Sequence, residues 1–396
     1  MKQEKSYLIR PLSPLVFRSA KPFGSLSDIS DIIFPLPSSG AGLIRTQTLL
    51  QKGYQLVQGK AKSLTVTEED QKNLLEIGHK GPFLVELGID NSFTILVHKP
   101  ANAIYLKNKE SGNIELIRLA PTQNLGSEQV GSDLPAGLLP VMMTKNIKGK
   151  PQPGPNLWPL KMAIHWQNGG DIKFEELNRE GIQSLPVDVR THVAIDNSTH
   201  AGIEGQLFQS ASYDFGAIRK DIKVGGWHDR SYGFLLLSDA SLHNNHVRFG
   251  GESRLSEMQS VAMPQDLTVP QSLVAEIEQA KGLQLTLLTP AIFSNGYLPA
   301  WLEEDSLTGI LPQTTIKVRL KACAMDRWLP VSGWDLHQKK PKAMRKAVAS
   351  GAVYWFEVLE GDISSITNLY FSSVSDQMQD QKDGFGIVVV APWSIQ

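Results

Sequence analysis

The sequence predicts an α+β protein with antiparallel sheets. Short runs of strand-forming residues recur along most of the chain, whereas helical patterns are few and short. Pro and Gly punctuate the connections between these segments. The chain has 396 residues, which at about 150 residues per domain predicts two domains and leaves room for a large insertion.

Strand signals begin with two hairpins. The first joins 83–87 to 93–97 around the polar turn 89–92, and the second joins 103–107 to 114–118 around 108–112. Further strands are predicted at 192–195, 232–237, 283–288, 316–321, 352–358 and 386–391.

Helix signals are start and stop residues. Thr67 with Asp70 three residues later predicts a capped helix over 68–77. A proline at the start and a glycine at the end bracket 271–281 and, in the same way, 342–350, so both are predicted to be helices.

One long segment is predicted to lack regular structure. Between 121 and 159 there are seven prolines and five glycines, which predicts a Pro/Gly-rich insertion around 119–160. A second break at 225–230 precedes the clear strand at 232–237, and we place the main domain boundary there. The predicted domains are therefore 1–225 and 226–396.

Composition excludes several classes of protein. Lys and Arg number 39 and Asp and Glu 40, so no global field attracts nucleic acid or membrane, and any such partner must be bound by local basic patches. The single cysteine, Cys323, excludes an intramolecular disulfide and CxxC metal sites, and it fits a reducing cytoplasm. The N-terminal apolar stretch is broken by Arg10, Pro11 and Pro14, and the longest apolar runs have strand length. We expect a cytoplasmic protein with no membrane partner.

Two N-terminal segments carry candidate anion sites. Serines and glycines run into a helical pattern after Pro37, and free N–H groups at a helix start suit a phosphate. A Walker loop is excluded because Gly-Lys-Ser/Thr is absent, and a plain helix with a serine cap remains the favoured alternative. The candidate residues here are Ser38, Ser39, Gly40, Arg45, Thr46 and Gln47. Arg18 and Lys21 lie beside Phe23 and Gly24, a combination that suits phosphate contact and base stacking or, alternatively, a solvated loop.

The region 317–346 has the strongest local excess of positive charge in the sequence. It holds nine cations and two acids, a balance of 9 − 2 = +7, with Trp328 and Trp334 among them. A strand places Lys317, Arg319 and Lys321 on one face. A helix opened by Pro341 would carry the other candidates, Lys342, Arg345 and Lys346. A patch for RNA or a partner protein and a merely solvated face are weighed equally.

Histidines and glycine turns complete the candidates. Arg190 lies beside His192, which starts the predicted strand 192–195, and for the histidine a general acid–base role competes with a structural one. No HExxH motif occurs, so no metal site is predicted. Paired glycines beside charge or aromatic residues allow close backbone approach, although a plain turn explains them too. These residues are Gly250, Gly251 and Arg254, and near the end Gly384, Phe385 and Gly386.

Taken together, these segments resemble the Cmr-type (type III-B) CRISPR subunit conventionally numbered three, of the RAMP superfamily. The matching stretches are 17–24, 34–38 leading to 42–46, 190–196 with 205–208, 250–254, 288–293 and 384–386. Their order and spacing over nearly the whole chain carry the resemblance. Family members often have a second arginine where this chain has Ser253.

The resemblance implies two tandem ferredoxin-like (RRM-like) RAMP domains and a subunit that binds the 5′ handle of the crRNA. It implies no catalysis and no cofactor, and as partners the large polymerase/cyclase-like subunit and the backbone RAMP subunit. The glycine loops beside Arg18, Lys21, Arg45 and Arg254 fit capture of a single-stranded backbone. The alternative is a RAMP-type endoribonuclease that processes precursor crRNA, with His192 as general acid or base. A metabolic enzyme is disfavoured because no cofactor or nucleophile motif is recognised.

Overall fold

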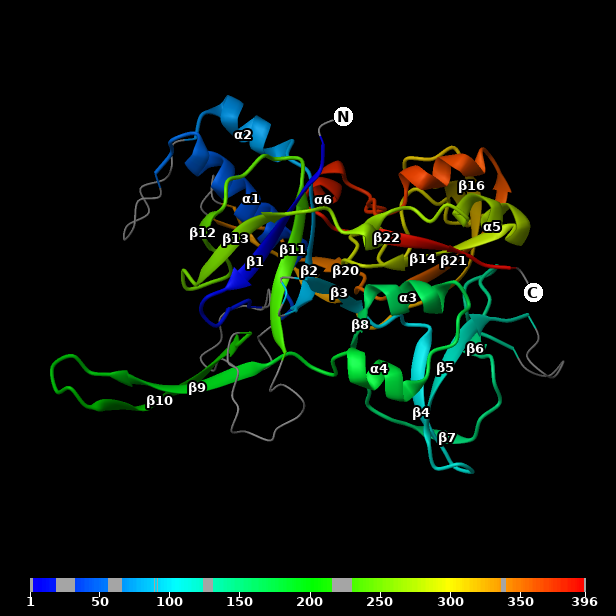
Figure 1. Ribbon diagram of the computed structural model, residues 1–396, viewed down its shortest axis with the longest axis horizontal. Helices are drawn as coiled ribbons and strands as arrows, with labels where there is room; N and C mark the ends of the chain where they lie inside the picture. Colours follow the sequence, from blue (N-terminus) through cyan, green and yellow to red (C-terminus); the bar gives the residue numbers. More distant parts are fainter. Residues whose placement is uncertain are drawn as a thin grey trace. The chain divides into compact units, whose positions relative to one another are not determined.

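The computed structural model describes residues 3–18, 33–55, 66–88, 90, 92–123, 131–215, 230–335 and 340–394. Over these residues antiparallel sheets dominate and helices are few, so the predicted α+β class is confirmed. Contacts divide the chain into two compact units (Figure 1). The first unit contains Met1–Phe93, Leu185–Ala262 and Pro330–Arg345, and the second contains Thr94–Ser184, Met263–Leu329 and Lys346–Gln396.

The first unit is built on antiparallel strands in the order β12-β13-β1-β11-β2. Their bounds are β1 Lys5–Pro11, β2 His79–Leu87, β11 Ser231–Ser238, β12 Asn245–Arg248 and β13 Leu255–Val261. Helix α1 (Pro37–Gln51) packs on β2, and α2 (Glu68–Leu75) packs on α1. The predicted cap of α2 is confirmed, because the Thr67 side chain accepts a hydrogen bond from the Asp70 N–H at 3.1 Å.

Aromatic rings fill the core of the first unit on one face of this sheet. Phe234 on β11 contacts Phe17 and Phe249 edge-on, with centroids 6.4 and 5.6 Å away, and Phe215 5.4 Å away. These four rings are almost fully buried. Edge-to-face pairs stabilise a core beyond the area they bury, so this cluster fixes the segments around Phe17 and Phe249 next to each other.

A two-stranded ribbon, β9 (Val187–Ile195) and β10 (Gly202–Tyr213), belongs to the same unit. Its base is joined to the unit by paired hydrogen bonds between the backbones of Leu15 and Tyr213, both 2.8 Å. Figure 1 shows the ribbon extending away from the sheet of this unit.

The second unit has a five-stranded antiparallel sheet in the order β15-β16-β21-β14-β22. The bounds are β14 Gly282–Leu287, β15 Thr308–Ile310, β16 Lys317–Ala324, β21 Val353–Glu360 and β22 Val388–Pro392. Helix α5 (Leu273–Ala280) packs on it within the predicted range 271–281, and β3 (Phe93–His98) pairs with β8 (Leu157–Pro159). The other helices are α3 (Leu160–Gln167), α4 (Phe174–Glu180) and the short α6 (Met378–Lys382).

The predicted insertion is a structured part of the second unit, so the expectation of irregular structure over 121–159 is wrong in part. It contains β6 (Val141–Met143), β7 (Gly149–Pro151) and β8, and β6 and β7 are the edges of the sheet β6-β5-β4-β7 formed with β4 (Ala103–Asn108) and β5 (Ile114–Pro121). Prolines are tolerated because these strands are short and lie at sheet edges or end at the proline.

The predicted helix over 342–350 is wrong. Only Arg345–Ala347 within this segment form a strand, β20, and the short strand β19 (Lys340–Pro341) precedes the segment. Ala343, Met344, Ala347 and Val348 have helical spacing, but the backbone of Val348 pairs with that of Ala291, so pairing with a distant segment overrides the local signal. The predicted domain boundary at 225/226 falls within 216–229, outside the described residues, and stays a prediction. Among the described helices, none is long and apolar enough to cross a membrane.

Candidate nucleic-acid interface

The loop between β12 and β13, residues 249–254, brings together four of the predicted site residues with one that was not predicted. Arg18, which is 234 residues from Glu252 in sequence, lies beside the loop, and Gly250, Gly251 and Arg254 belong to the loop itself. The additional residue is Glu252. We call residues 249–254 the arginine loop, and Arg18 with Arg254 the arginine pair.

Glycine is required where the arginine loop meets the chain at Val16. Gly250 has φ +86°, and a Cβ there would lie 2.8 Å from the Val16 carbonyl oxygen. The N–H of Gly251 donates to that carbonyl at 2.8 Å, and the N–H of Phe249 donates to the Arg254 carbonyl at 3.1 Å. The close backbone approach predicted for these glycines is therefore observed, and it positions Arg254 relative to Arg18.

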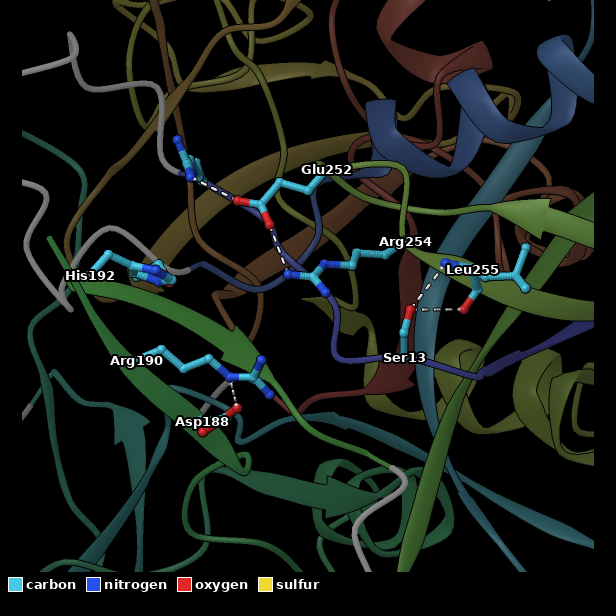
Figure 2. Close-up of polar contacts among 9 residues, drawn as sticks. Ser13, Asp188, Arg190, His192, Glu252, Arg254 and Leu255 are labelled. Carbon is cyan, nitrogen blue, oxygen red and sulfur yellow. Dashed lines mark hydrogen bonds and ion pairs between the residues drawn. The ribbon is translucent and has the colours of Figure 1, made fainter. Parts of the chain in front are cut away.

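One carboxylate joins the arginine pair. Glu252 Oε1 lies 3.1 Å from Arg18 Nη2, and Glu252 Oε2 lies 2.8 Å from Arg254 Nη2. Figure 2 shows the Glu252 carboxylate between two guanidinium groups, one of which is that of Arg254. Among the described residues the buried Arg254 Nε has no hydrogen-bond partner, so within that part of the chain this guanidinium uses only part of its donor capacity.

The backbone that presents Glu252 is strained. Glu252 and Ser253 both have left-handed backbones, with φ of 57° and 55°. Such a conformation costs a residue with a Cβ about 1–2 kcal/mol, and strained residues cluster at ligand sites.

At the end of the loop, Ser13 holds the start of β13 in place, because the Leu255 N–H donates to Ser13 Oγ at 3.1 Å (Figure 2). Two guanidiniums held around one carboxylate are suited to bind a single anion at two points.

Arg190 and His192 lie on β9, on one face of the ribbon (Figure 2). Arg190 Nε donates to Asp188 Oδ2 at 2.7 Å, and His192 Nε2 shares a 2.7 Å hydrogen bond with Ser210 Oγ. The ribbon thus presents both side chains from the paired strand β9, which begins before the predicted strand 192–195.

The candidates on α1 make contacts within the fold. The predicted serine cap is wrong, because Leu36 is the N-cap and Ser38 and Ser39 are already helical. A Cβ on Gly40 would lie 2.3 Å from His79 Nε2, so this glycine permits close packing of α1 on β2. The Nε of Arg45 donates to the Leu74 carbonyl at 3.0 Å.

Two further candidate side chains on α1 are also engaged within the fold. Thr46 Oγ1 donates to the Gly42 carbonyl at 2.7 Å, and Gln47 is buried. Lys21 lies outside the described residues.

The glycine turn near the end of the chain is part of the core of the second unit. Phe385 is 1% exposed, so its ring has no face free to stack on a base. The Gly386 N–H donates to the Pro290 carbonyl at 2.8 Å, and Thr289 Oγ1 donates to the Gly384 carbonyl at 2.8 Å.

The basic strand β16 carries its three cations on one face as predicted, alternating with buried Val318, Leu320 and Ala322. Each cation has an acidic neighbour on β21. Lys317 lies 3.4 Å from Glu360, Arg319 3.5 Å and Lys321 3.8 Å from Glu357. The sequence balance of +7 therefore overstates the free charge of this region.

Lys342 and Lys346 are exposed, and Arg345 is half-buried. They lie in or beside β19 and β20 instead of on a helix. Lys346 Nζ lies 5.3 Å from the ring centroid of Trp328, which is 53% exposed. Within the described residues no group of three or more His, Cys, Asp or Glu side chains could hold a metal ion.

Glu252 was missed because its role depends on an arginine 234 residues away. The only local signal is an acidic residue between a glycine pair and an arginine, in the order Gly-Gly-Glu-Ser-Arg.

Comparisons with known proteins identify the family. A sequence model described as CRISPR-associated protein (Cas_Cmr3) matches residues 7–393. Two solved structures contain a chain with 16% identity and a TM-score of 0.49. In "Cryo-EM structure of the Type III-B Cmr-beta bound to cognate target RNA and AMPPnP, state 1" the match covers 98% of this chain and 99% of that chain. In "Cryo-EM structure of the Type III-B Cmr-beta bound to cognate target RNA" it covers 97% and 96%.

The comparison with curated proteins gives no match. The segment matched by the family model covers nearly the whole sequence and includes the arginine loop and residues of both units. The chain therefore belongs to the Cas_Cmr3 family of CRISPR-associated proteins, the family that the sequence resemblance predicted.

Proposed function

We propose that this protein is a non-catalytic subunit of a type III-B CRISPR effector complex that binds the 5′ handle of the crRNA. The observation that supports it best is the arginine pair around Glu252, at 3.1 and 2.8 Å. Arginine binds phosphate with charge-assisted hydrogen bonds, and two arginines held at one carboxylate, Arg254 on the arginine loop and Arg18 outside it, can bind a single-stranded backbone at two points. In the free protein the carboxylate of Glu252 occupies the place of a phosphate oxygen pair.

The same proposal covers the finer features of fold and partners. The chain consists of two tandem ferredoxin-like RAMP domains, 1–225 and 226–396, and faces away from the arginine pair contact the large polymerase/cyclase-like subunit and the backbone RAMP subunit. The near-neutral net charge of −1 supports this arrangement, because affinity for RNA then comes from local cations while the remaining surface is free to meet protein.

The experiment compares a labelled handle RNA with an unrelated RNA of the same length, using the full-length protein at several salt concentrations. About three or four phosphate contacts predict a slope of roughly −2 to −3 in the logarithm of the binding constant against the logarithm of salt. Arg254→Ala should weaken binding of the handle by about tenfold. Equal affinity for both RNAs would refute handle recognition.

Catalysis is tested separately. The endoribonuclease alternative uses His192 as its general acid or base, and the Nε2 of this residue lies 2.7 Å from the Ser210 hydroxyl oxygen. We expect no cleavage when the protein is incubated with a repeat-containing transcript in EDTA. Cleavage that disappears in His192→Ala would favour the alternative.

A further inference from the structure

Four lysines lie together on one face of the paired strands β4 and β7 in the second unit (Figure 1). Lys107 on β4 lies directly opposite Lys150 on β7. The N–H of Lys109 donates to the Lys148 carbonyl at 2.9 Å, which continues the same register two residues further on. Opposed residues share a face, and so do residues two apart along a strand. The two lysine pairs therefore share one face, about 6.7 Å apart along the strands, and we call these four residues the lysine cluster.

The lysine cluster is exposed and is not neutralised by the fold. All four residues are exposed, and in the part of the chain that the structure describes none of them forms an ion pair. Glu115 on β5 lies opposite Leu106, so its carboxylate belongs to the other face of the sheet, where Asn108 Nδ2 donates to it at 2.6 Å. The cations of β16 differ, because each of them has a carboxylate of β21 beside it.

Directly opposed lysines are unfavourable for the sheet that contains them, because like charges facing each other across two strands repel. Residues 103–121 and 141–151, which supply the strands of this sheet, contain six cations and two acids, a balance of 6 − 2 = +4 in a chain of net charge −1. A bound anion would relieve this repulsion.

The backbone that carries the lysine cluster is held on both sides of it. Tyr105 is buried, and its hydroxyl donates to the Pro155 carbonyl at 2.8 Å. The N–H of Gln152 donates to the Tyr105 carbonyl at 3.0 Å. In the turn after β4, Asn108 Oδ1 accepts a hydrogen bond from the N–H of Glu110 at 2.8 Å. A backbone that is already ordered reduces the entropy lost on binding.

The composition of this face favours a phosphate backbone over a protein surface. Protein interfaces have an apolar centre and are depleted in lysine, whereas Ile114, which lies opposite Lys107 on β5, is already half-buried. Tyr105 is the aromatic residue on this face of β4, and its burial leaves no ring there on which a base can stack. Lysine is a compact point charge, and contacts to phosphate carry no information about base sequence.

We propose that the lysine cluster binds the phosphate backbone of a single nucleic-acid strand, independently of base sequence. This site lies in the second unit, whereas the arginine pair that we propose for the handle lies in the first. The arginine pair would then supply preference for the handle, and the lysine cluster would add affinity for a strand of any sequence.

The experiment measures the affinity of the full-length protein for a uridine homopolymer RNA and a thymidine homopolymer DNA of equal length. Lys107→Gln with Lys150→Gln removes one opposed pair. The matched control is Lys161→Gln with Lys173→Gln, which removes the same charge at exposed positions of the same unit. Thermal unfolding and the preference for handle RNA over an unrelated RNA are measured for every variant.

We expect the Lys107→Gln/Lys150→Gln variant to bind the homopolymers about tenfold or more weakly than the wild type at about 50 mM salt. The slope of the logarithm of the binding constant against the logarithm of salt should become shallower by about 1.4, because each phosphate contact of a single strand contributes about 0.7. The melting temperature should rise, since the repulsion between the two lysines is gone. The control variant should bind as the wild type does, and both variants should keep the preference for the handle.

The two homopolymers distinguish the source of the strand. A loss of equal size on both is expected if the lysines contact phosphate alone, and a loss confined to the RNA or to the DNA would assign the strand to that nucleic acid.

Three results would overturn the proposal. The first is unchanged affinity of the Lys107→Gln/Lys150→Gln variant for both homopolymers, and the second is an equal loss in the control. The third is equal affinity of the wild type for polyglutamate, which would assign the cluster to an acidic protein surface. If the glutamine variant melts at a lower temperature, Lys107→Arg with Lys150→Arg decides: this variant keeps the charge and should keep the affinity, and its failure to do so would refute an electrostatic role.

The proposed function fails on a different measurement. If the wild type does not prefer the handle while the glutamine variant still loses affinity for the homopolymers, handle recognition is refuted and the lysine cluster is supported.

Discussion

Replacing Glu252 by glutamine should strengthen binding of the handle RNA. The carboxylate of Glu252 is held by Arg18 and Arg254, so an incoming phosphate must displace it and then remain close to its negative charge. Glutamine keeps the shape of the side chain and removes the charge. The expected gain therefore comes from less competition for the two guanidiniums and less repulsion of the phosphate.

The size of this gain follows from the exposure of the three side chains. Two unit charges about 5 Å apart interact by roughly 1 kcal/mol in water and about 3 kcal/mol at an effective dielectric constant near 20. Because the side chains of Arg18, Glu252 and Arg254 are 50, 43 and 30% exposed, the lower value applies. A gain of about 1 kcal/mol is roughly fivefold in affinity at low salt.

The assay is a titration of labelled handle RNA at low and at physiological salt. Glu278→Gln is the matched control, since it changes the net charge from −1 to 0 in the same way at an exposed position in the other unit. The advantage of Glu252→Gln should shrink as salt rises. Thermal stability should change by less than about 1 kcal/mol, because the ion pairs it loses are exposed.

Equal or weaker binding by Glu252→Gln, with Arg254→Ala clearly impaired, would show that the carboxylate positions the arginines and does not compete with phosphate. If neither variant differs from the wild type, the arginine pair is not an RNA contact.

Three further predictions concern the scaffold. Burial lowers the pKa of His98 from 6.5 to about 4, against the opposing effect of Asp326, so its stabilising contribution is complete above about pH 6.5 and is lost as the pH falls toward 4. Denaturant titrations across this window should show that the free energy of unfolding falls by about 2 kcal/mol, a modest value because part of His98 remains exposed. This loss should be absent in His98→Gln. Arg45→Ala should lower the free energy of unfolding by about 1–3 kcal/mol through loss of the Leu74 contact, and an unchanged melting curve with weaker RNA binding would restore its predicted role at the phosphate. Gly40→Ala should destabilise the protein by about 1–3 kcal/mol, because His79 has to move, and a melting temperature equal to the wild type would contradict that packing.

Local signals predicted the structure where neighbours in sequence determine it. The cap of α2 depends on Thr67 and Asp70 alone, and the alternation along β16 requires only that strand. The prediction of a helix at 342–350 failed because the backbone of Val348 pairs with that of Ala291, a contact with a distant segment that the local end signals do not reveal.

The site was predicted in part for the same reason. Gly250, Gly251 and Arg254 are close in sequence and remain together, but their alignment with Arg18 is set by the Val16 backbone and the aromatic cluster, which no local pattern reveals. Phe385 illustrates the opposite case: glycines on either side indicate an open loop, whereas the ring itself is core.

The position of β1 in its sheet has a consequence for synthesis of the protein. β1 lies between β11 and β13, so both of its neighbours are translated more than 200 residues later. A ribosome must therefore complete residues up to Val261 before Arg18 and Arg254 can face each other. Nascent chains up to that point have no assembled arginine pair, so the RNA contact that we propose for this pair would form only after β13 has been translated.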